Sequence, residues 1–140
     1  MSNPAVNCVL LANRHHGLTE GIRGLLETAF DAVVMVADET SLLESAAGLH
    51  PTLAVVDLSL SRGEGLEWLP RLRSRCPDVR LVVLSVYDQP SVCQRVMAAG
   101  AHAFVLKRSI VTDLLPAIDA VQAGQSFVSP EIGHFSPRPD

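Results

Sequence analysis

The sequence predicts an α/β fold of the doubly wound (βα)5 kind, a three-layer sandwich with one parallel sheet between two layers of helices. Five short runs rich in Val, Leu and Ala recur near residues 6–12, 33–37, 53–56, 81–84 and 103–106. The stretches between these runs have apolar residues at helical spacing. Apolar strands that alternate with amphipathic helices indicate strands buried on both faces, which is typical of a parallel sheet covered by helices on both sides.

The predicted helices are bounded by residues that begin or end helices. The first has apolar residues at helical spacing between positions 18 and 29. Ser41 and Glu44 resemble a capping box at the start of the second, and Pro77 ends the third. Pro90 suits the first turn of the fourth. The glycines that follow helical segments and mark their ends are Gly48, Gly100 and Gly124.

The chain has the size of a single domain. Its 140 residues, 48% of them hydrophobic, are enough to form one core. We expect the domain to occupy residues 1–124 and a linker-like tail to follow at residues 125–140. The tail contains Pro130, Pro137 and Pro139, which favour irregular structure. The sequence therefore predicts that the chain leaves the core after the fifth helix.

Charge and hydropathy argue against two classes of partner. A net charge of −4 provides no basic surface for DNA or for an anionic membrane. No basic and apolar leader opens the chain, and no apolar run approaches the roughly 18 residues that span a bilayer. We therefore expect a cytoplasmic protein without membrane contact. Cys8, Cys76 and Cys93 are odd in number and lack CxxC spacing, which predicts reduced, buried thiols.

Polar side chains follow four of the five apolar runs where each run ends. They are Asn13 with Arg14, Asp57, Ser85 and Lys107, the single lysine of the chain. Because ligands of open α/β sheets bind beyond the carboxyl ends of the strands, we expect these side chains to converge. Phosphoryl transfer onto Asp57 would suit this set, with Lys107 neutralising phosphoryl oxygens and Ser85 donating a hydrogen bond. Taken singly, each residue is equally well explained as a loop cap, a surface charge or a strand-end hydroxyl.

Four segments match a known pattern. LAVVDLSLSRGEG at residues 53–65 and LSVYD at residues 84–88 resemble the acceptor strand and the fourth-strand hydroxyl motif of bacterial response regulator receiver domains. AAGAHAFVLK at residues 98–107 is similar to their fifth-strand region and has the aromatic Phe104 three positions before the lysine. DLLPAIDAVQAGQSFVSPEI at residues 113–132 resembles the LuxR/NarL-type branch, whose receivers precede a helix-turn-helix.

The resemblance, from residue 6 to about residue 132, implies a flavodoxin-like fold with a five-stranded parallel sheet of order 2-1-3-4-5. It implies a signalling module rather than an enzyme, in which a histidine kinase or a small phosphodonor phosphorylates Asp57. Ser85 would then shift toward the phosphoryl group and Phe104 would turn inward, although Phe104 is equally well explained as a core aromatic. The implied output surface is the fourth helix, fifth strand and fifth helix, which is also a candidate face for a homodimer. DNA binding would require a C-terminal helix-turn-helix domain, which is absent from this chain.

Two positions depart from the family pattern. Asn13 and Arg14 stand where receivers carry two adjacent acidic residues. Mg²⁺ prefers carboxylate ligands, and Asp57 is the carboxylate that remains at this site. The sequence therefore predicts weak or absent metal binding. We hypothesise that Arg14 points toward Asp57 and replaces part of the charge of the metal, and the alternative is an exposed Arg14 without a role. The acceptor loop also differs, since Ser61 occupies the position of a common proline.

Two other functions compete with a phosphorylated receiver. The stronger is a degenerate pseudo-receiver, which would use the same fold as a phosphorylation-independent interaction or dimerisation module. Retention of Asp57, Ser85 and Lys107 favours phosphoryl chemistry, whereas the loss of the acidic pair favours the pseudo-receiver. A phosphatase of the haloacid dehalogenase type fits less well, because Ser59 stands where those enzymes need a second Asp as general acid.

Overall fold

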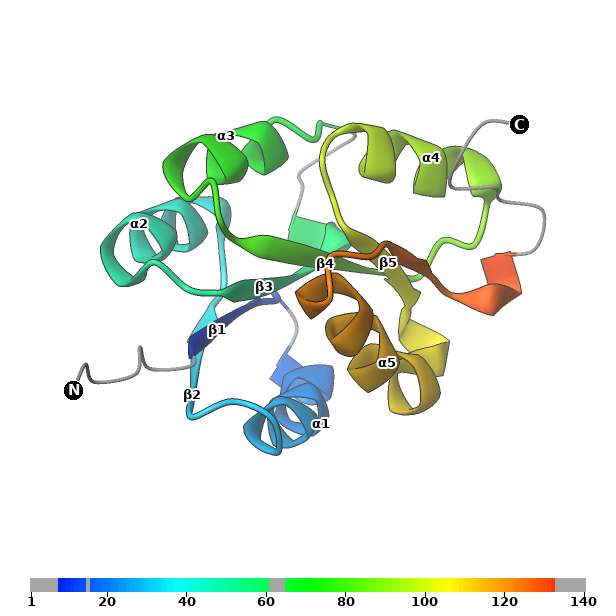
Figure 1. Ribbon diagram of the computed structural model, residues 1–140, viewed down its shortest axis with the longest axis horizontal. Coiled ribbons are helices and arrows are strands. Elements are labelled where there is room, and N and C mark those ends of the chain that lie inside the picture. The colour runs from blue at the N-terminus through cyan, green and yellow to red at the C-terminus, as the bar shows by residue number, and fades with distance from the viewer. Residues whose placement is uncertain (1–7, 15, 61–64, 133–140) are drawn as a thin grey trace.

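The computed structural model describes residues 8–14, 16–60 and 65–132, in which strands and helices alternate along the chain (Figure 1). The strands are β1 (Cys8–Ala12), β2 (Ala32–Val36), β3 (Leu53–Asp57), β4 (Arg80–Ser85), β5 (Ala103–Leu106) and β6 (Phe127–Val128). The α-helices are α1 (His16–Glu27), α2 (Glu39–Leu49), α3 (Trp68–Arg75), α4 (Pro90–Ala98) and α5 (Ile110–Gln122). The short 3₁₀ helices are η1 (Leu58–Leu60), η2 (Lys107–Ser109) and η3 (Pro130–Ile132). The predicted α/β alternation is confirmed.

All the strands of the described residues pair in parallel in one sheet of order β2-β1-β3-β4-β5-β6. The predicted order of the first five strands is confirmed, but the prediction of a five-stranded sheet is wrong. After α5 the chain turns at Gly124, whose φ of 84° suits glycine, and returns to place Phe127 beside Ala103. A strand of two residues is too short to produce a periodic pattern in the sequence.

The segment after α5 packs onto the domain. Ser129 is 1% exposed and Ile132 is 4% exposed, and Ile132 lies in the same apolar cluster as Phe104. The contacts of the domain therefore continue past the predicted boundary at Gly124 and reach Ile132. Residues 133–140 of the predicted tail lie outside the described residues.

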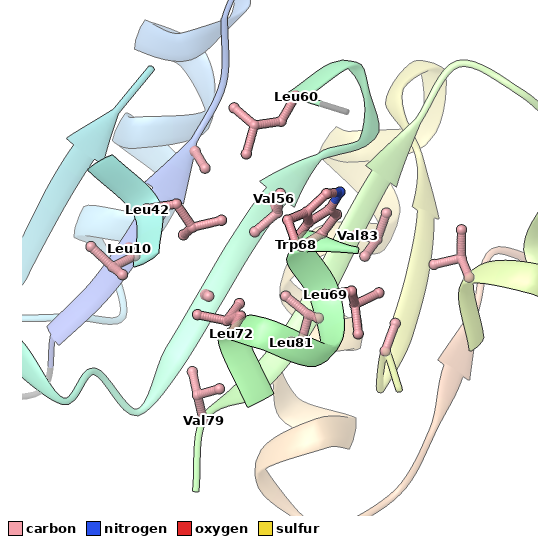
Figure 2. Close-up of a cluster of buried hydrophobic side chains, with 14 of the residues drawn as sticks. Leu10, Leu42, Val56, Leu60, Trp68, Leu69, Leu72, Val79, Leu81 and Val83 are labelled. Atoms are coloured by element: carbon pink, nitrogen blue, oxygen red, sulfur yellow. The ribbon is translucent and has the colours of Figure 1, made fainter. Parts of the chain in front are cut away.

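Helices cover both faces of the sheet and form three layers (Figure 1), with α2, α3 and α4 on one face and α1 and α5 on the other. Successive strand residues contribute to alternate cores: Leu10 packs with α2 and α3, whereas Val9 and Leu11 pack with α1. Figure 2 shows the first of these cores, in which Trp68 of α3 lies close to Val56 of β3. Every residue of β1, β3 and β5 is buried, so polar side chains are confined to the strand ends.

Helix α2 begins earlier and ends later than predicted. The Asp38 carboxylate accepts a hydrogen bond from the Ser41 amide at 2.7 Å and caps the helix, so the predicted capping box at Ser41 is wrong. Gly48 lies inside the helix, which ends instead at His50 in the left-handed conformation. Pro90 occupies the first turn of α4, as predicted. None of the described helices combines the length and the apolar character needed to cross a membrane.

The three cysteines are buried, as predicted, and none of them forms a disulfide. Cys93 lies in the core that α4 forms with the sheet. Burial raises the pKa of the Cys93 thiol to about 12, so this thiol is protonated near neutral pH. Because the thiolate is the reactive form, Cys93 is a packing residue and not a nucleophile.

The His102 side chain joins the start of β5 to β4. Its Nδ1 accepts a hydrogen bond from the Leu81 amide at 3.0 Å, and its own amide donates to the Leu81 carbonyl at 2.9 Å. Burial and the neighbouring guanidinium groups of Arg73 and Arg80 lower the pKa of His102 below its ordinary value of 6.5. Protonation of Nδ1 would remove the acceptor of the buried Leu81 amide, so the folded state favours the neutral imidazole.

We expect His102 to make the free energy of unfolding decrease as the pH falls below 6.5, because the unfolded chain then binds more protons at this histidine than the folded chain does. The contribution of His102 to the free energy of unfolding is fully present above the pKa of this histidine in the unfolded chain. It is lost as the pH falls through the lowered pKa of the folded state. Urea unfolding at several pH values measures it. His102→Asn keeps an acceptor near the Leu81 amide but does not titrate, so the variant should lose this part of the pH dependence. An unchanged pH dependence in His102→Asn would contradict the assignment.

Candidate functional site

The predicted site residues converge at the carboxyl edge of the sheet. Asp57 ends β3 and pairs in register with Leu84 of β4, which places it next to Ser85. Ser85 ends β4 and pairs with Leu106, the residue directly before Lys107. Parallel pairing brings these strand ends to one edge, since all the strands run in the same direction. The carboxylate, the hydroxyl and the ammonium therefore share one region of the molecule.

The Asp57 carboxylate is held by two groups. Its Oδ2 forms an ion pair with Lys107 Nζ, and its Oδ1 accepts a hydrogen bond from the Ser59 amide at 2.9 Å. The Asp57 side chain is 2% exposed and the Lys107 side chain 14% exposed, so both charges are largely removed from water. An uncompensated carboxylate at this depth would be costly, and the ammonium offsets that cost. Lys107 is therefore the counterion that the buried charge of Asp57 requires, and it is not merely an exposed surface charge.

The Ser85 hydroxyl forms hydrogen bonds with the backbone of the loop between β4 and α4. Ser85 Oγ accepts from the Tyr87 amide at 2.8 Å and donates to the Tyr87 carbonyl at 3.2 Å. Both the donor and an acceptor site of the hydroxyl are thus used within this loop. Phe104 is fully buried in the apolar cluster that includes Val96 and Cys93 of α4, so its ring points inward in this structure.

Arg14 does not form the ion pair that we hypothesised with Asp57. Arg14 is exposed, and its Nη1 lies 3.5 Å from the carbonyl oxygen of Ser59, the residue whose amide binds Asp57. Among the ion pairs of the described residues, Asp57 is paired with Lys107. A guanidinium on an exposed loop keeps its hydration by reaching outward along the protein surface. The contact with Ser59 gives Arg14 an indirect connection to the acceptor carboxylate.

The residues at this edge do not fit a magnesium ion well. Mg²⁺ requires hard oxygen ligands in octahedral geometry. Asn13 is 5% exposed and brings a neutral amide, while Asp57 is already bound to Lys107 and to the Ser59 amide. Over the described part of the chain, no group of three or more His, Cys, Asp or Glu residues is arranged to hold a metal. Ser61 and residues 62–64 of the acceptor loop lie outside the described residues.

Comparison with known proteins decides the family. The family model of the response regulator receiver domain matches residues 9–119, which is most of the chain. The chain belongs to this family. The predicted resemblance is confirmed, and the fold is the flavodoxin-like receiver fold with one added strand.

Relatives of this receiver are regulators of the LuxR/NarL type. The nitrate/nitrite response regulator protein NarL of Escherichia coli is 31% identical over 131 residues, which are 92% of this chain and 61% of NarL. The transcriptional regulatory protein DegU of Brevibacillus brevis is 27% identical over 128 residues, which are 90% of this chain and 54% of DegU. The receiver thus spans less than two thirds of the length of these relatives.

Solved structures give the same result. The RcsB response regulator of Salmonella typhimurium matches with a TM-score of 0.80 at 26% identity, over 91% of this receiver and 65% of that chain. A LuxR-family two-component response regulator from Aurantimonas sp. matches with a TM-score of 0.81 at 27% identity, over 89% of this receiver and 91% of that chain.

Two features of the receiver site are not readable from the sequence. The Ser59 amide binds Asp57 through the backbone, which any residue at this position would provide. Arg108, next to Lys107, joins Asp88 to Glu131 through ion pairs of 3.2 Å and 2.8 Å. These partners are separated by many residues in sequence, so only the folded chain brings them together.

We expect Lys107→Met to decrease the free energy of unfolding by about 3 kcal/mol, because Asp57 would remain as a buried charge without its counterion. Urea unfolding measures the loss. The double variant Asp57→Asn/Lys107→Met should recover much of it, since the charge is then removed as well. Arg75→Met, which removes an exposed cation on α3, serves as the control and should cost little. A double variant as unstable as Lys107→Met would show that the ion pair is not the cause.

Proposed function

We propose that this receiver of a two-component system accepts a phosphoryl group on Asp57 from a histidine kinase or a small phosphodonor, and that it acts as a switch rather than as an enzyme. The observation that supports the proposal most is the buried Asp57 carboxylate, which pairs with Lys107. This pair lies at the edge of the sheet where β4 ends at Ser85. A nucleophilic carboxylate beside a fixed ammonium is the arrangement that phosphoryl transfer onto Asp requires.

The proposed transfer follows from the contacts of each group. An oxygen of Asp57 attacks the phosphorus, and the bond between phosphorus and the donor breaks with its electrons going to the leaving group. The product is an acyl phosphate that carries about two negative charges. Lys107 then pairs with phosphoryl oxygens in place of Asp57 Oδ2, which neutralises part of the added charge. Ser85 gives up its bond to the Tyr87 carbonyl and donates to a phosphoryl oxygen.

We propose that this transfer does not depend on Mg²⁺. Asn13 and Arg14 replace the two acidic residues that other receivers carry, and Asp57 is engaged by Lys107 and the Ser59 amide. The Arg14 guanidinium contacts the Ser59 carbonyl and adds positive charge beside the residue whose amide binds Asp57. In this role Arg14 is a positioning residue, because it acts on Asp57 through the Ser59 peptide.

A pseudo-receiver remains the alternative, and one observation favours it. Asp57 already has Lys107 as its counterion and a hydrogen bond from the Ser59 amide, so its charge is balanced without a phosphoryl group. Function would then reside in the interaction surface that α4, β5 and α5 are expected to form, also for a homodimer. Because β6 pairs with β5, this surface includes β6 along the edge of the sheet.

We expect acetyl phosphate to add one phosphoryl group to Asp57 at similar rates in Mg²⁺ and in EDTA, because the described residues provide no group of three or more carboxylate, histidine or cysteine ligands for a metal. Intact-mass spectrometry of the protein measures the addition, and Asp57→Asn is the control that should remain unmodified. Modification that requires Mg²⁺ would show that a metal binds despite the missing acidic pair. No modification in either condition would favour the pseudo-receiver.

We also expect Arg14→Gln to slow this metal-free modification by roughly fivefold, because the variant removes positive charge near the acceptor loop. Arg75→Gln makes the same change in charge on an exposed position of α3 and serves as the matched control. The time course of the mass change in EDTA measures both. Equal rates for the two variants would mean that Arg14 is a solvent-exposed residue without a role.

A further inference from the structure

The segment from residue 127 to residue 132, which we name the C-terminal clasp, lies along the outer edge of β5 (Figure 1). The Phe127 amide donates to the His102 carbonyl at 3.2 Å, and the Ser129 amide donates to the Phe104 carbonyl at 2.9 Å. The clasp thus uses carbonyl groups of the β5 edge that would otherwise be open to a partner strand. An edge covered by the chain itself is protected from pairing with other chains.

The clasp is fixed by a buried polar staple. The Ser129 hydroxyl accepts from the Leu106 amide at 3.0 Å and donates to Asp113 Oδ2 at 2.8 Å. Ser129 is 1% exposed and Leu106 is 1% exposed, so water does not replace these bonds while the clasp is closed. The hydroxyl therefore connects three elements, namely the clasp, β5 and α5.

A second connection is made by charges at the end of the clasp. Arg108 Nε lies 2.8 Å from Glu131 Oε1 in η3, and Arg108 Nη2 lies 3.2 Å from Asp88 Oδ2 in the loop before α4. These side chains are about half exposed, so the pairs are weaker than the buried staple. Their importance is geometric, because one guanidinium joins the clasp to the loop that Ser85 holds.

The clasp contacts both neighbours of Lys107. The Leu106 amide donates a hydrogen bond to the Ser129 hydroxyl. The Lys107 ammonium forms an ion pair with Asp57, and the Arg108 guanidinium forms one with Glu131. These three residues are consecutive, so a movement of Lys107 changes the backbone on which the clasp rests. The loop at residues 87–88 provides a second route, since it is bonded to Ser85 on one side and to Arg108 on the other.

We propose that the C-terminal clasp is a displaceable element whose hold on the β5 edge depends on the ion pair between Asp57 and Lys107, and that through it the site acts on the chain that follows Ile132. The proposal rests on the proposed function in one respect, namely that phosphorylation is what breaks this ion pair. A phosphoryl group that draws Lys107 and the Ser85 hydroxyl toward itself loosens the Leu106 amide and the Asp88 loop together. The coupling is reciprocal, so opening the clasp must also change the environment of Lys107.

Amide hydrogen exchange in the full 140-residue protein tests the clasp directly. Asp57→Asn breaks the ion pair with Lys107 without any phosphorylation, and we expect it to speed exchange at Leu106, Phe127 and Ser129 by roughly fivefold or more. Exchange in β1 and β2, on the far side of the sheet, should stay the same. Exchange in Asp57→Asn within twofold of the unmodified protein at all three amides would overturn the proposal.

Two variants serve as the positive and the negative control for this experiment. Ser129→Ala removes the staple and should speed exchange at the Leu106 amide at least as much as Asp57→Asn does. Ser126→Ala makes the same chemical change at a neighbouring exposed position and should leave exchange unaltered. A Leu106 amide that exchanges no faster in Ser129→Ala would also overturn the proposal, because the staple would not be what holds the clasp.

Phosphorylation is tested on the protein with Asp57 unchanged, by intact mass and amide exchange after treatment with acetyl phosphate. A mass increase with faster exchange in the clasp supports both the clasp and the phosphorylated receiver. A mass increase with unchanged exchange overturns the clasp alone. If no mass increase occurs, the phosphorylated receiver fails, and the Asp57→Asn result still decides whether the ion pair between Asp57 and Lys107 controls the clasp.

Discussion

Burial of the central strands on both faces is the constraint on which the rest of this receiver depends. Every residue of β1, β3 and β5 is buried, as are the last five of β4, so the strands carry apolar side chains between two layers of helices. Polar side chains have room only where the strands end. Because the strands are parallel, their carboxyl ends meet at one edge. Asp57, Ser85 and Lys107 are together for this reason.

The same burial explains the electrostatics of the site. A carboxylate that is 2% exposed needs a counterion, and Lys107 supplies it from the next but one strand. Asn13 and Arg14 bring an amide and an exposed guanidinium to this edge of the sheet, and neither group is a carboxylate that would attract a hard cation. The charge of Asp57 is thus balanced from within the protein, which is compatible both with a metal-independent receiver and with a pseudo-receiver.

The edge of the sheet adds a feature to the expected receiver fold. β6 pairs with β5 and the Ser129 hydroxyl satisfies the Leu106 amide, so the strand that bears Lys107 is supported from its outer side. The edge of β5 is therefore not an open surface in this structure. The contacts of Leu106, Lys107 and Arg108 link the acceptor carboxylate to the end of the described chain over a short distance in sequence. This arrangement gives the C-terminal segment a physical connection to the site.

The sequence by itself determined the parallel α/β fold, the order of the first five strands and the set of polar residues at the strand ends, because burial leaves a local and periodic pattern of apolar residues. Tertiary structure alone decided the rest. β6 is too short to be periodic, the cap at Asp38 depends on backbone geometry, and the staple of Ser129 joins residues far apart in sequence. The contact of Arg14 with the Ser59 carbonyl likewise appears only in the folded chain, because the two residues are far apart in sequence. Hydrogen bonds and ion pairs between distant segments require the folded chain, since no local pattern of residue types encodes them.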